Sequence, residues 1–327
     1  METIYAGRRQ AVVCLGETAR QVLAASSEGR VLAVFSKVVY LMSDAGRLIW
    51  LTTNEAPMHR RALRVGGSPP RPSAGSSYTV CHDELALDDG SVLDWRRARA
   101  WRPPRPDGEL PLDLDELWRR LRSVRSFVDG LPAPRGFGLL LAPSQDSSPG
   151  MDLAPDFPGS PPALRRGLPA IRAMADAWRS GDRGGLLACA EGLLGLGEGL
   201  TPSGDDFIGA MLFAIVSLDG VYAPTSSFSP SAVRRFLKRA RQRTNLISYT
   251  LLHDHAVGQA SEALHRLLRA LLGGESVAVI SRLASDVIRI GHSTGWDLLA
   301  GLWLAMSLAP AGLDPRSRVP MPGPYLA

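Results

Sequence analysis

The sequence predicts an α+β protein, with a β-rich N-terminal domain followed by an α-helical C-terminal domain. Alternating β-branched and aromatic residues fill the first third of the chain, and a series of amphipathic or wholly apolar segments follows residue 164. In addition, one short motif precedes two apolar helices in nearly the same form, which predicts a pseudo-repeated helix start. The length of 327 residues is typical of two domains.

Short strands are expected in the N-terminal domain, residues 1–142. Residues 30–53 alternate apolar runs with the turn signal Ser-Asp-Ala-Gly, which predicts two or three antiparallel strands. Residues 66–77 hold too much Gly, Pro and Ser for regular structure. Residues 78–81 and 91–95 predict further strands.

The remaining segments predict one early helix, a boundary and a helical domain. Apolar residues at helical spacing predict a helix near residues 112–131, and the apolar run at 136–142 predicts a buried strand that rejoins the first sheet. Residues 143–162 are rich in Pro, Ser and Gly and predict a linker or a mobile loop over the site. A helical domain over 163–310 and an irregular tail over 311–327 follow. The helices of the domain over 163–310 are expected at residues 164–179, 183–194, 205–218, 231–252, 257–272, 277–290 and 296–308.

Composition narrows the classes of function. The net charge is +5, and nearly all of the basic residues are arginines. Two clusters of arginines lie at residues 96–105 and 234–243. We expect these clusters to be solvated faces or docking sites for an acidic partner, because no nucleic-acid-binding motif accompanies them. The three cysteines are far apart and predict no disulfide framework. No segment is long and apolar enough for a signal peptide or a membrane span, so we expect a cytoplasmic protein.

The stretch GLGEGLTPSGDDF, residues 195–207, is the first candidate site. Ser203 followed by Asp206 fits a capping box, a purely structural interpretation. That interpretation does not explain the glycines, including Gly197 and Gly199, or the second carboxylate of Asp205. The G-x-G spacing alone is weak support for a dinucleotide site, since here it follows a predicted helix.

A second stretch, GHSTGWDLLAGLWLA at residues 291–305, repeats the pattern at an offset of 91 residues. Ser203 pairs with Thr294, and Asp206 pairs with Asp297. We therefore predict a pseudo-twofold arrangement of two converging helix starts, in which Asp206 and Asp297 face a shared pocket. Two capping boxes that merely look alike remain the alternative.

Such a site offers N–H donors to an anion and carboxylate oxygens to an amide, an ammonium group or a metal. The candidate catalytic residues are Asp205, Asp206, His292 and Asp297. The candidate substrate-binding residues are Gly197, Gly199, Thr201, Ser203, Gly204, Ser293, Thr294 and Gly295. No cofactor is indicated with certainty, although the carboxylates could orient Mg²⁺. A metal pair at His253 and His255 is disfavoured by the i, i+2 spacing.

With both motifs in view, the chain resembles the AllH-type family, whose members are named as a subunit of oxamate carbamoyltransferase. The resemblance is strong over residues 186–302 and weaker in the N-terminal half. Pro is more usual in the family at the position of Glu198. The resemblance implies a cytoplasmic protein that works with companion subunits in purine-nitrogen (allantoin) catabolism. There a carbamoyl group moves between oxalurate and phosphate, giving oxamate and carbamoyl phosphate.

Two hypotheses follow from the residues and the resemblance together. In the first, the chain is a catalytic or substrate-binding subunit that binds a small amide or carboxylate substrate at the paired helix starts. In the second, it is a non-catalytic assembly subunit whose arginine faces dock the partner subunits. Nucleic-acid binding is a third and weaker interpretation.

Overall fold

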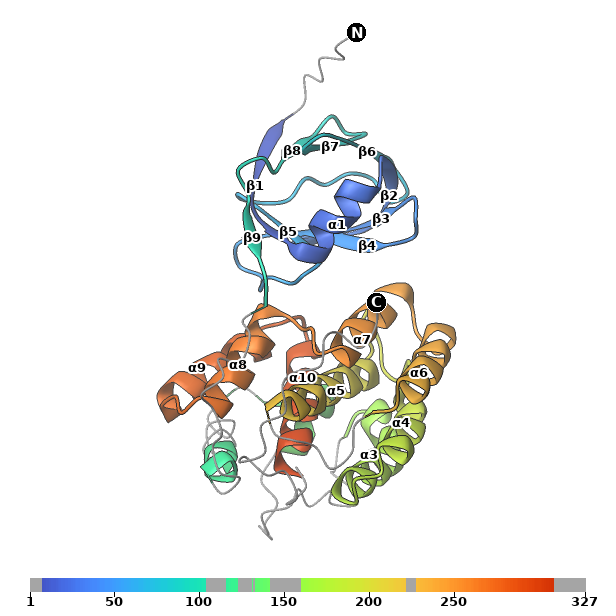
Figure 1. Cartoon of the computed structure of the whole chain (residues 1–327), viewed down its shortest axis with the longest axis vertical. Coiled ribbons are helices and arrows are strands. Elements are labelled where there is room, and N and C mark those ends of the chain that lie inside the picture. The colour runs from blue at the N-terminus through green and yellow to red at the C-terminus, as the bar shows by residue number, and fades with distance from the viewer. Residues whose placement is uncertain are drawn as a thin grey trace. The chain divides into compact units, whose positions relative to one another are not determined.

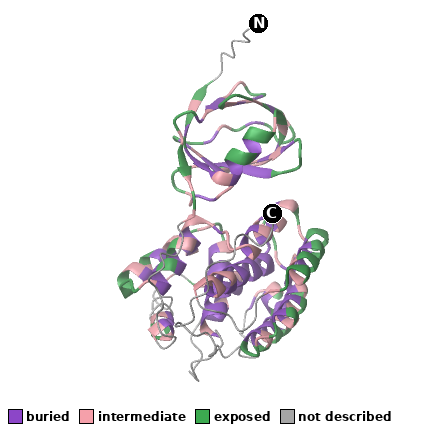
Figure 2. Ribbon diagram, in the orientation of Figure 1, coloured by how far each residue is buried: buried purple, intermediate pink, exposed green. Residues whose placement is uncertain are grey.

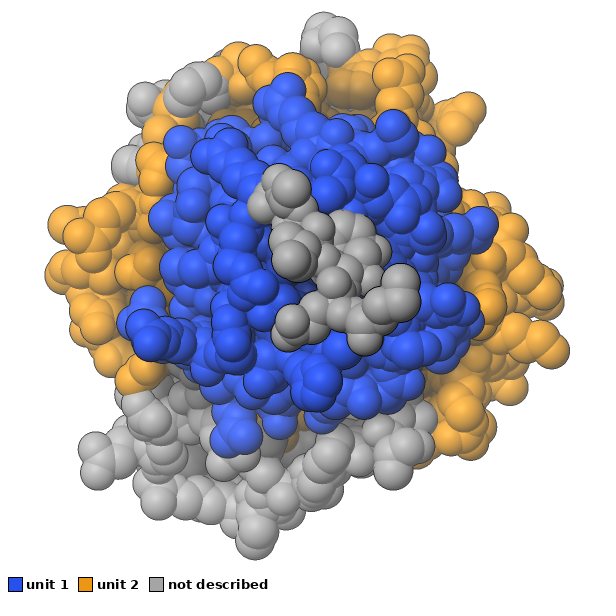
Figure 3. All heavy atoms as spheres, turned by 90° about the horizontal axis from the view of Figure 1, so that it is seen from above, with its two compact units in different colours: residues 1–104 blue, residues 105–327 orange. Residues whose placement is uncertain are grey.

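The computed structural model describes residues 8–103, 116–122, 131, 133–141, 160–221 and 228–308 (Figure 1). The chain divides into two compact units, Met1–Pro104 and Arg105–Ala327, which Figure 3 distinguishes by colour. The division therefore falls earlier than the boundary expected within residues 143–162. Most of that expected linker and the expected tail at 311–327 lie outside the described residues.

The N-terminal unit is a β-barrel in which the strands follow the order β5-β4-β3-β2-β6-β7-β8-β1-β9 and β5 also pairs with β1. Its strands are β1 (Arg9–Gly16), β2 (Glu28–Val34), β3 (Val38–Ser43), β4 (Leu48–Thr52), β5 (Ala62–Val65), β6 (Ser77–Cys81), β7 (Glu84–Leu87), β8 (Val92–Asp94) and β9 (Arg99–Trp101).

The strand predictions for this unit are confirmed. Strands β2, β3 and β4 form an antiparallel meander over the region expected to hold two or three strands. Strands β6 and β8 match the two later predictions, and residues 66–76 lie outside regular structure. Helix α1 (Glu17–Ala25), which the sequence pattern did not reveal, buries Val22 and Leu23 in the barrel core.

The second unit is helical in its described part, which confirms the α+β class. Its elements are η1 (Gly136–Leu141), α3 (Pro162–Arg179), α4 (Arg183–Ala190), η2 (Glu191–Leu193), α5 (Ser203–Val221), α6 (Pro230–Arg243), α7 (Leu246–Ala256), α8 (Glu262–Leu272), α9 (Val277–Ile288) and α10 (Thr294–Ser307). Residues 116–122 are also helical, in agreement with the helix expected near 112–131; residues 112–115 and 123–130 lie outside the described residues, and residue 131 is a bend.

Two predictions for this unit are wrong. The described part of the apolar run expected as a strand, Gly136–Leu141, forms the 3₁₀ helix η1, and its Phe137 packs in the core of the helical unit. The helix expected over 231–252 is two helices, because α6 ends at Arg243 and α7 begins after Asn245. The Asn245 side chain accepts hydrogen bonds from the N–H groups of Ile247 and Ser248, as an N-cap does.

Helices α5 and α10 pack against each other at the centre of the unit and are buried along most of their lengths (Figure 2). Among the described residues, no helix combines the length and apolar character that crossing a bilayer requires. The contact between these two helices is close at Gly301, where a Cβ atom would lie 2.1 Å from the carbonyl oxygen of Phe207.

Gly301→Ala is therefore expected to destabilise the protein by about 1–3 kcal/mol, because an added methyl group forces two packed backbones apart. Urea denaturation measures the effect. Gly184→Ala in α4 is the matched control, since its Cβ would meet Asp182 at an ordinary 3.6 Å and Ala favours a helix interior. Equal stability of the two variants would contradict the close packing.

Candidate functional site

The glycine loop between η2 and α5 adopts a backbone that other residues rarely can. Gly195, Gly197 and Gly199 have φ values of 71°, 127° and 89°. A Cβ atom on Gly195 would lie 2.3 Å from the carbonyl oxygen of Arg243, and one on Gly197 would lie 2.6 Å from the nitrogen of Ser203. Two of the glycines thus allow close approach as well as positive φ. Gly199 faces open space and is exposed.

Asp205 is held entirely by groups of the same chain. Its carboxylate accepts hydrogen bonds from the N–H of Gly195 at 2.8 Å, from the hydroxyl of Ser248 at 2.7 Å and from the hydroxyl of Thr244. Burial raises the pKa of Asp205, and these three hydrogen bonds oppose that rise. The side chain therefore anchors the glycine loop to the junction between α6 and α7.

Asp206 and Asp297, one from each motif, are brought together in the core. Asp206 is 4% exposed and Asp297 is 0% exposed. In each carboxyl group one oxygen, Oδ2, is buried without a hydrogen-bond partner in the described structure. Such orphaned buried oxygens are rare and call for an explanation.

The electrostatics of this pair follow from burial and proximity. Burial is the main cause that raises the pKa of Asp206 well above its usual value, and the nearby charge of Asp297 raises it further. Burial also raises the pKa of Asp297 to about 6, against the effects of the Phe137 N–H and the Ser203 and Ser293 hydroxyls. The pair therefore holds a proton more readily than ordinary aspartates do. We refer to these two residues as the acidic pair.

Hydroxyl groups from each motif face the acidic pair. Thr201 and Thr294 lower the pKa of Asp206, and their own hydroxyls lie 2.9 Å apart. Ser203, from the first motif, acts on Asp297 of the second. Since Ser203 lies within α5 and the N–H groups of Asp205 and Asp206 donate to the carbonyl of Pro202, the capping-box interpretation does not describe this helix start.

Helix η1 contacts the carboxyl group of Asp297. The N–H of Phe137 donates to Asp297 Oδ1 at 2.6 Å, and a Cβ atom on Gly136 would lie 2.3 Å from the same oxygen. Gly136 has a φ of 58°, so glycine serves both the backbone turn and the close approach. Its segment was expected in the N-terminal sheet, which is why the sequence pattern did not reveal this contact.

Two expected backbone donors are already engaged within the chain. The N–H of Gly204 donates to the carbonyl of Leu196 at 2.8 Å, and that of Gly295 donates to the carbonyl of Ile290 at 2.9 Å. Each glycine also lies against a backbone carbonyl, of Leu193 or Val287, at a position where no Cβ could fit. These glycines therefore permit close packing of the helix starts rather than offering N–H groups to a ligand.

His292 lies at the exposed edge of this region, beside an arginine. Nη1 of Arg135 is 2.7 Å from Nδ1 and 3.1 Å from Nε2 of the imidazole. A guanidinium group only donates hydrogen bonds, so Arg135 is the donor in any hydrogen bond of this pair. Besides Gly136 and Phe137, the motif search missed the contacting residues Arg135, Thr244 and Ser248. Only their position beside the motifs in the fold identifies them.

The structure shows no ready-made metal cluster within the ranges it describes. No group of three or more His, Cys, Asp or Glu side chains there could hold a metal ion. His255, one of the two histidines considered at sequence level, is buried beside Phe213, and burial lowers its pKa to about 4.

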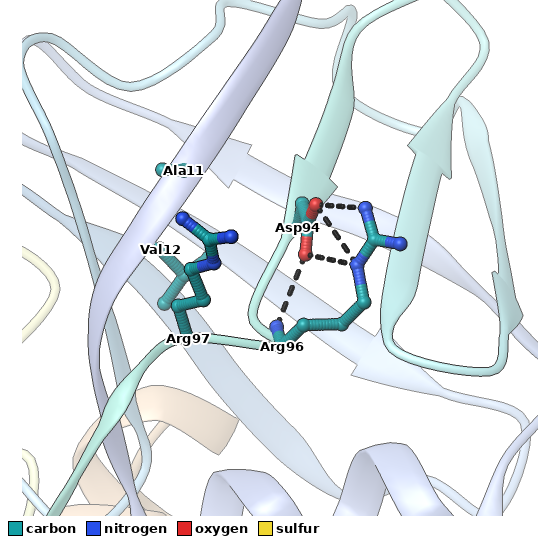
Figure 4. A pocket seen from close by; sticks show the side chains of 5 residues that line it. All are labelled: Ala11, Val12, Asp94, Arg96 and Arg97. Carbon is teal, nitrogen blue, oxygen red and sulfur yellow. Dashed lines mark hydrogen bonds and ion pairs between the residues drawn. The ribbon is translucent and has the colours of Figure 1, made fainter.

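A separate pocket of about 430 Å³ lies in the N-terminal unit, between β1 and the turn that follows β8 (Figure 4). Its lining residues are Ala11, Val12, Asp94, Arg96 and Arg97. The Asp94 carboxylate is occupied by Arg96, which lowers the pKa of Asp94 to about 2. None of the candidate catalytic or substrate-binding residues lies here, although Arg96 and Arg97 belong to the first arginine cluster.

The fold and the candidate site together define an α+β protein in which the starts of two buried helices bring two carboxyl groups together. Residues 193–306, which span both motifs, match the model of the family described as oxamate carbamoyltransferase subunit AllH. The chain thus carries an AllH-type segment, and the resemblance seen in its motifs is confirmed. No curated protein and no solved structure is significantly similar to the chain.

Proposed function

We propose that the chain is a substrate-binding and catalytic subunit of an oxamate carbamoyltransferase-like complex. The family match points to a subunit of such an enzyme, and the subunit designation points to companion subunits. The observation that carries the proposal is the pair of orphaned oxygens on Asp206 and Asp297. An amide N–H or an ammonium group would satisfy both oxygens, and the amide ends of oxalurate and oxamate offer such donors.

The acidic pair suits the proton transfer that this reaction needs. When phosphate oxygen attacks the carbamoyl carbon of oxalurate, the carbon–nitrogen bond breaks and the departing oxamate nitrogen takes up a proton. A carboxyl group whose pKa is raised by burial, as it is in both members of the acidic pair, can supply it. Solvent then restores the proton to the carboxyl group.

The arrangement of hydroxyl groups supports a pseudo-twofold relation between the motifs. Ser203 of the first motif faces Asp297, and Thr294 of the second motif faces Asp206, so each motif contributes the same kind of contact to the other. Gly204 and Gly295 occupy matching positions against backbone carbonyls. We propose that the two helix starts form one composite site on this basis.

Mg²⁺ is a further candidate for the same position. The acidic pair and the neighbouring hydroxyl groups are oxygen donors, the type that Mg²⁺ prefers. A bound Mg²⁺ ion would polarise a phosphoryl or carbonyl oxygen, whereas the protonated pair would act on nitrogen. Loss of activity with a chelator, restored by Mg²⁺, would distinguish these alternatives.

Asp206→Asn and Asp297→Asn are each expected to lower carbamoyl transfer in the reconstituted complex about 100-fold or more, since Asn keeps the shape but cannot transfer the proton. Turnover of oxalurate with phosphate is the measurement, with melting temperature as the check on folding. Asp176→Asn on the exposed face of α3 is the control. Full activity in both variants would exclude the proposed role of the pair.

An assembly role without catalysis is the second candidate. Helix α6 presents exposed Arg234, Arg235 and Arg241, and its buried side is formed by Phe236, Leu237 and Ala240. Such a basic face could dock an acidic partner subunit. This candidate predicts that the aspartate variants remain fully active while charge reversal on α6 disrupts the complex.

We propose that this activity belongs to purine-nitrogen catabolism in the cytoplasm, as the resemblance to the AllH-type family implies. In this assignment the basic faces meet companion subunits rather than nucleic acid. Size-exclusion chromatography of the coexpressed subunits, with and without RNA, tests the choice of partner.

A further inference from the structure

Arg135 lies beside the candidate site and has no carboxylate partner among the described residues. In the described part of the chain, the recorded side-chain partner of Arg135 is the imidazole of His292, and both residues are exposed. The guanidinium group has five N–H donors, and a contact through Nη1 occupies only part of that set. The remaining donors point to a ligand that is itself an acceptor.

Two separate connections hold this cation beside the acidic pair. Arg135 directly precedes Gly136 and Phe137, which contact Asp297 Oδ1 through the close backbone approach and the N–H donor. His292 lies just before α10, the helix that carries Asp297. The cation and the buried carboxyl group of Asp297 are therefore connected by two short segments of chain.

The two groups differ in what they can bind. Orphaned carboxyl oxygens at Asp206 and Asp297 suit hydrogen-bond donors, whereas a guanidinium suits the paired oxygens of a carboxylate or phosphate. A molecule with an amide at one end and an anion at the other would satisfy both. An anion without an amide would engage the arginine alone.

We propose that Arg135, oriented by His292, binds the anionic oxygens of the substrate while the amide end occupies the acidic pair. This inference rests on the proposed function. It assigns a specificity-determining residue to the site and defines the ligand class as amide acids. The same guanidinium geometry would accept phosphate, the other anion that carbamoyl transfer requires.

Isothermal titration of the full chain with oxamate and with its neutral analogue oxamide tests the inference. The wild-type chain is expected to bind oxamate at least about tenfold more tightly, as a charge-assisted bidentate contact provides. Arg135→Ala should abolish that preference and leave oxamide binding unchanged. Arg135→Lys should restore only part of it, because Lys lacks the planar pair of donors.

His292 is a positioning residue in this scheme. His292→Gln should retain the preference for oxamate, because the Gln carbonyl can accept from Arg135, whereas His292→Ala should reduce it. Arg179→Ala on α3, where the arginine pairs with Asp176 at the surface, is the matched control and should bind like wild type.

The outcomes separate this inference from the function on which it rests. Asp297→Asn should weaken oxamate and oxamide alike; if it does and Arg135→Ala binds oxamate like wild type, the arginine inference is wrong and the acidic pair stands. If Arg135→Ala alone weakens oxamate, the anion subsite stands and the role of the pair fails. A loss of inorganic phosphate binding in Arg135→Ala, with oxamate unaffected, would also overturn the inference, because the arginine would then bind phosphate and not the substrate anion. No binding of any probe by the wild-type chain would overturn both.

Discussion

Asp297→Asn is expected to stabilise the folded chain at pH 8 by about 3 kcal/mol, even though it removes a proposed catalytic group. The buried carboxyl group of Asp297 has a pKa of about 6, above the model value of 3.8. The folded state therefore binds this proton more tightly than the unfolded state does. Stability from this group is fully present below pH 3.8, and it is lost as the pH rises through 6.

The measurement is urea denaturation of wild type and variant at pH 4.5 and pH 8. The gain from Asp297→Asn should be small at pH 4.5 and large at pH 8, because Asn carries no charge at either pH. Burial raises the pKa of Asp206 well above its usual value and that of Asp219 to about 6, so these two groups should leave some pH dependence in the variant. Asp176→Asn at the surface is the control and should change stability little at both values. A gain that is the same at both pH values would contradict the assignment.

Asp205→Ala is expected to have the opposite effect and to destabilise the protein by about 3 kcal/mol or more. The change leaves the Gly195 N–H and the hydroxyls of Thr244 and Ser248 without their shared acceptor. Each buried donor left unsatisfied costs about 1–3 kcal/mol. The melting temperature should fall by roughly 6–12 °C for a helical unit of this size.

Ser248→Ala provides the comparison for Asp205→Ala, since it removes one of these three hydrogen bonds and leaves the other two. We expect a loss of about 1 kcal/mol for this variant. If both variants melt at the same temperature, Asp205 does not act as the common anchor.

The α+β class could be predicted because the period of the apolar residues differs between the two halves of the chain. Strands β2 to β4 follow the alternation of β-branched and aromatic residues, and α10 follows an apolar run of helical length. The error at Gly136–Leu141 has a physical cause. A short apolar run has no period that separates a strand from a 3₁₀ helix. Its actual neighbours, Phe207 and Trp296, are contacts that only the tertiary structure supplies.

The residues of the candidate site could also be predicted only in part from the sequence. The repeated motifs pointed to Asp206 and Asp297 because both residues sit one turn inside an apolar helix start. The local pattern could not show that Ser203 faces the other motif instead of capping its own helix, or that Asp205 serves as an anchor. Nor could it reveal Arg135, since a single arginine in a loop carries no signal in the sequence.

The close contact between α5 and α10 also has a consequence for the order of folding. The two helices begin some 90 residues apart, and the acidic pair exists only when they meet. Contacts of such long range form late, after the intervening loop has been closed. During synthesis, the first motif therefore leaves the ribosome well before its partner, with Asp206 still hydrated and ordinary in its chemistry. The pKa of Asp206 rises only when α10 packs against α5 and brings Asp297 beside it.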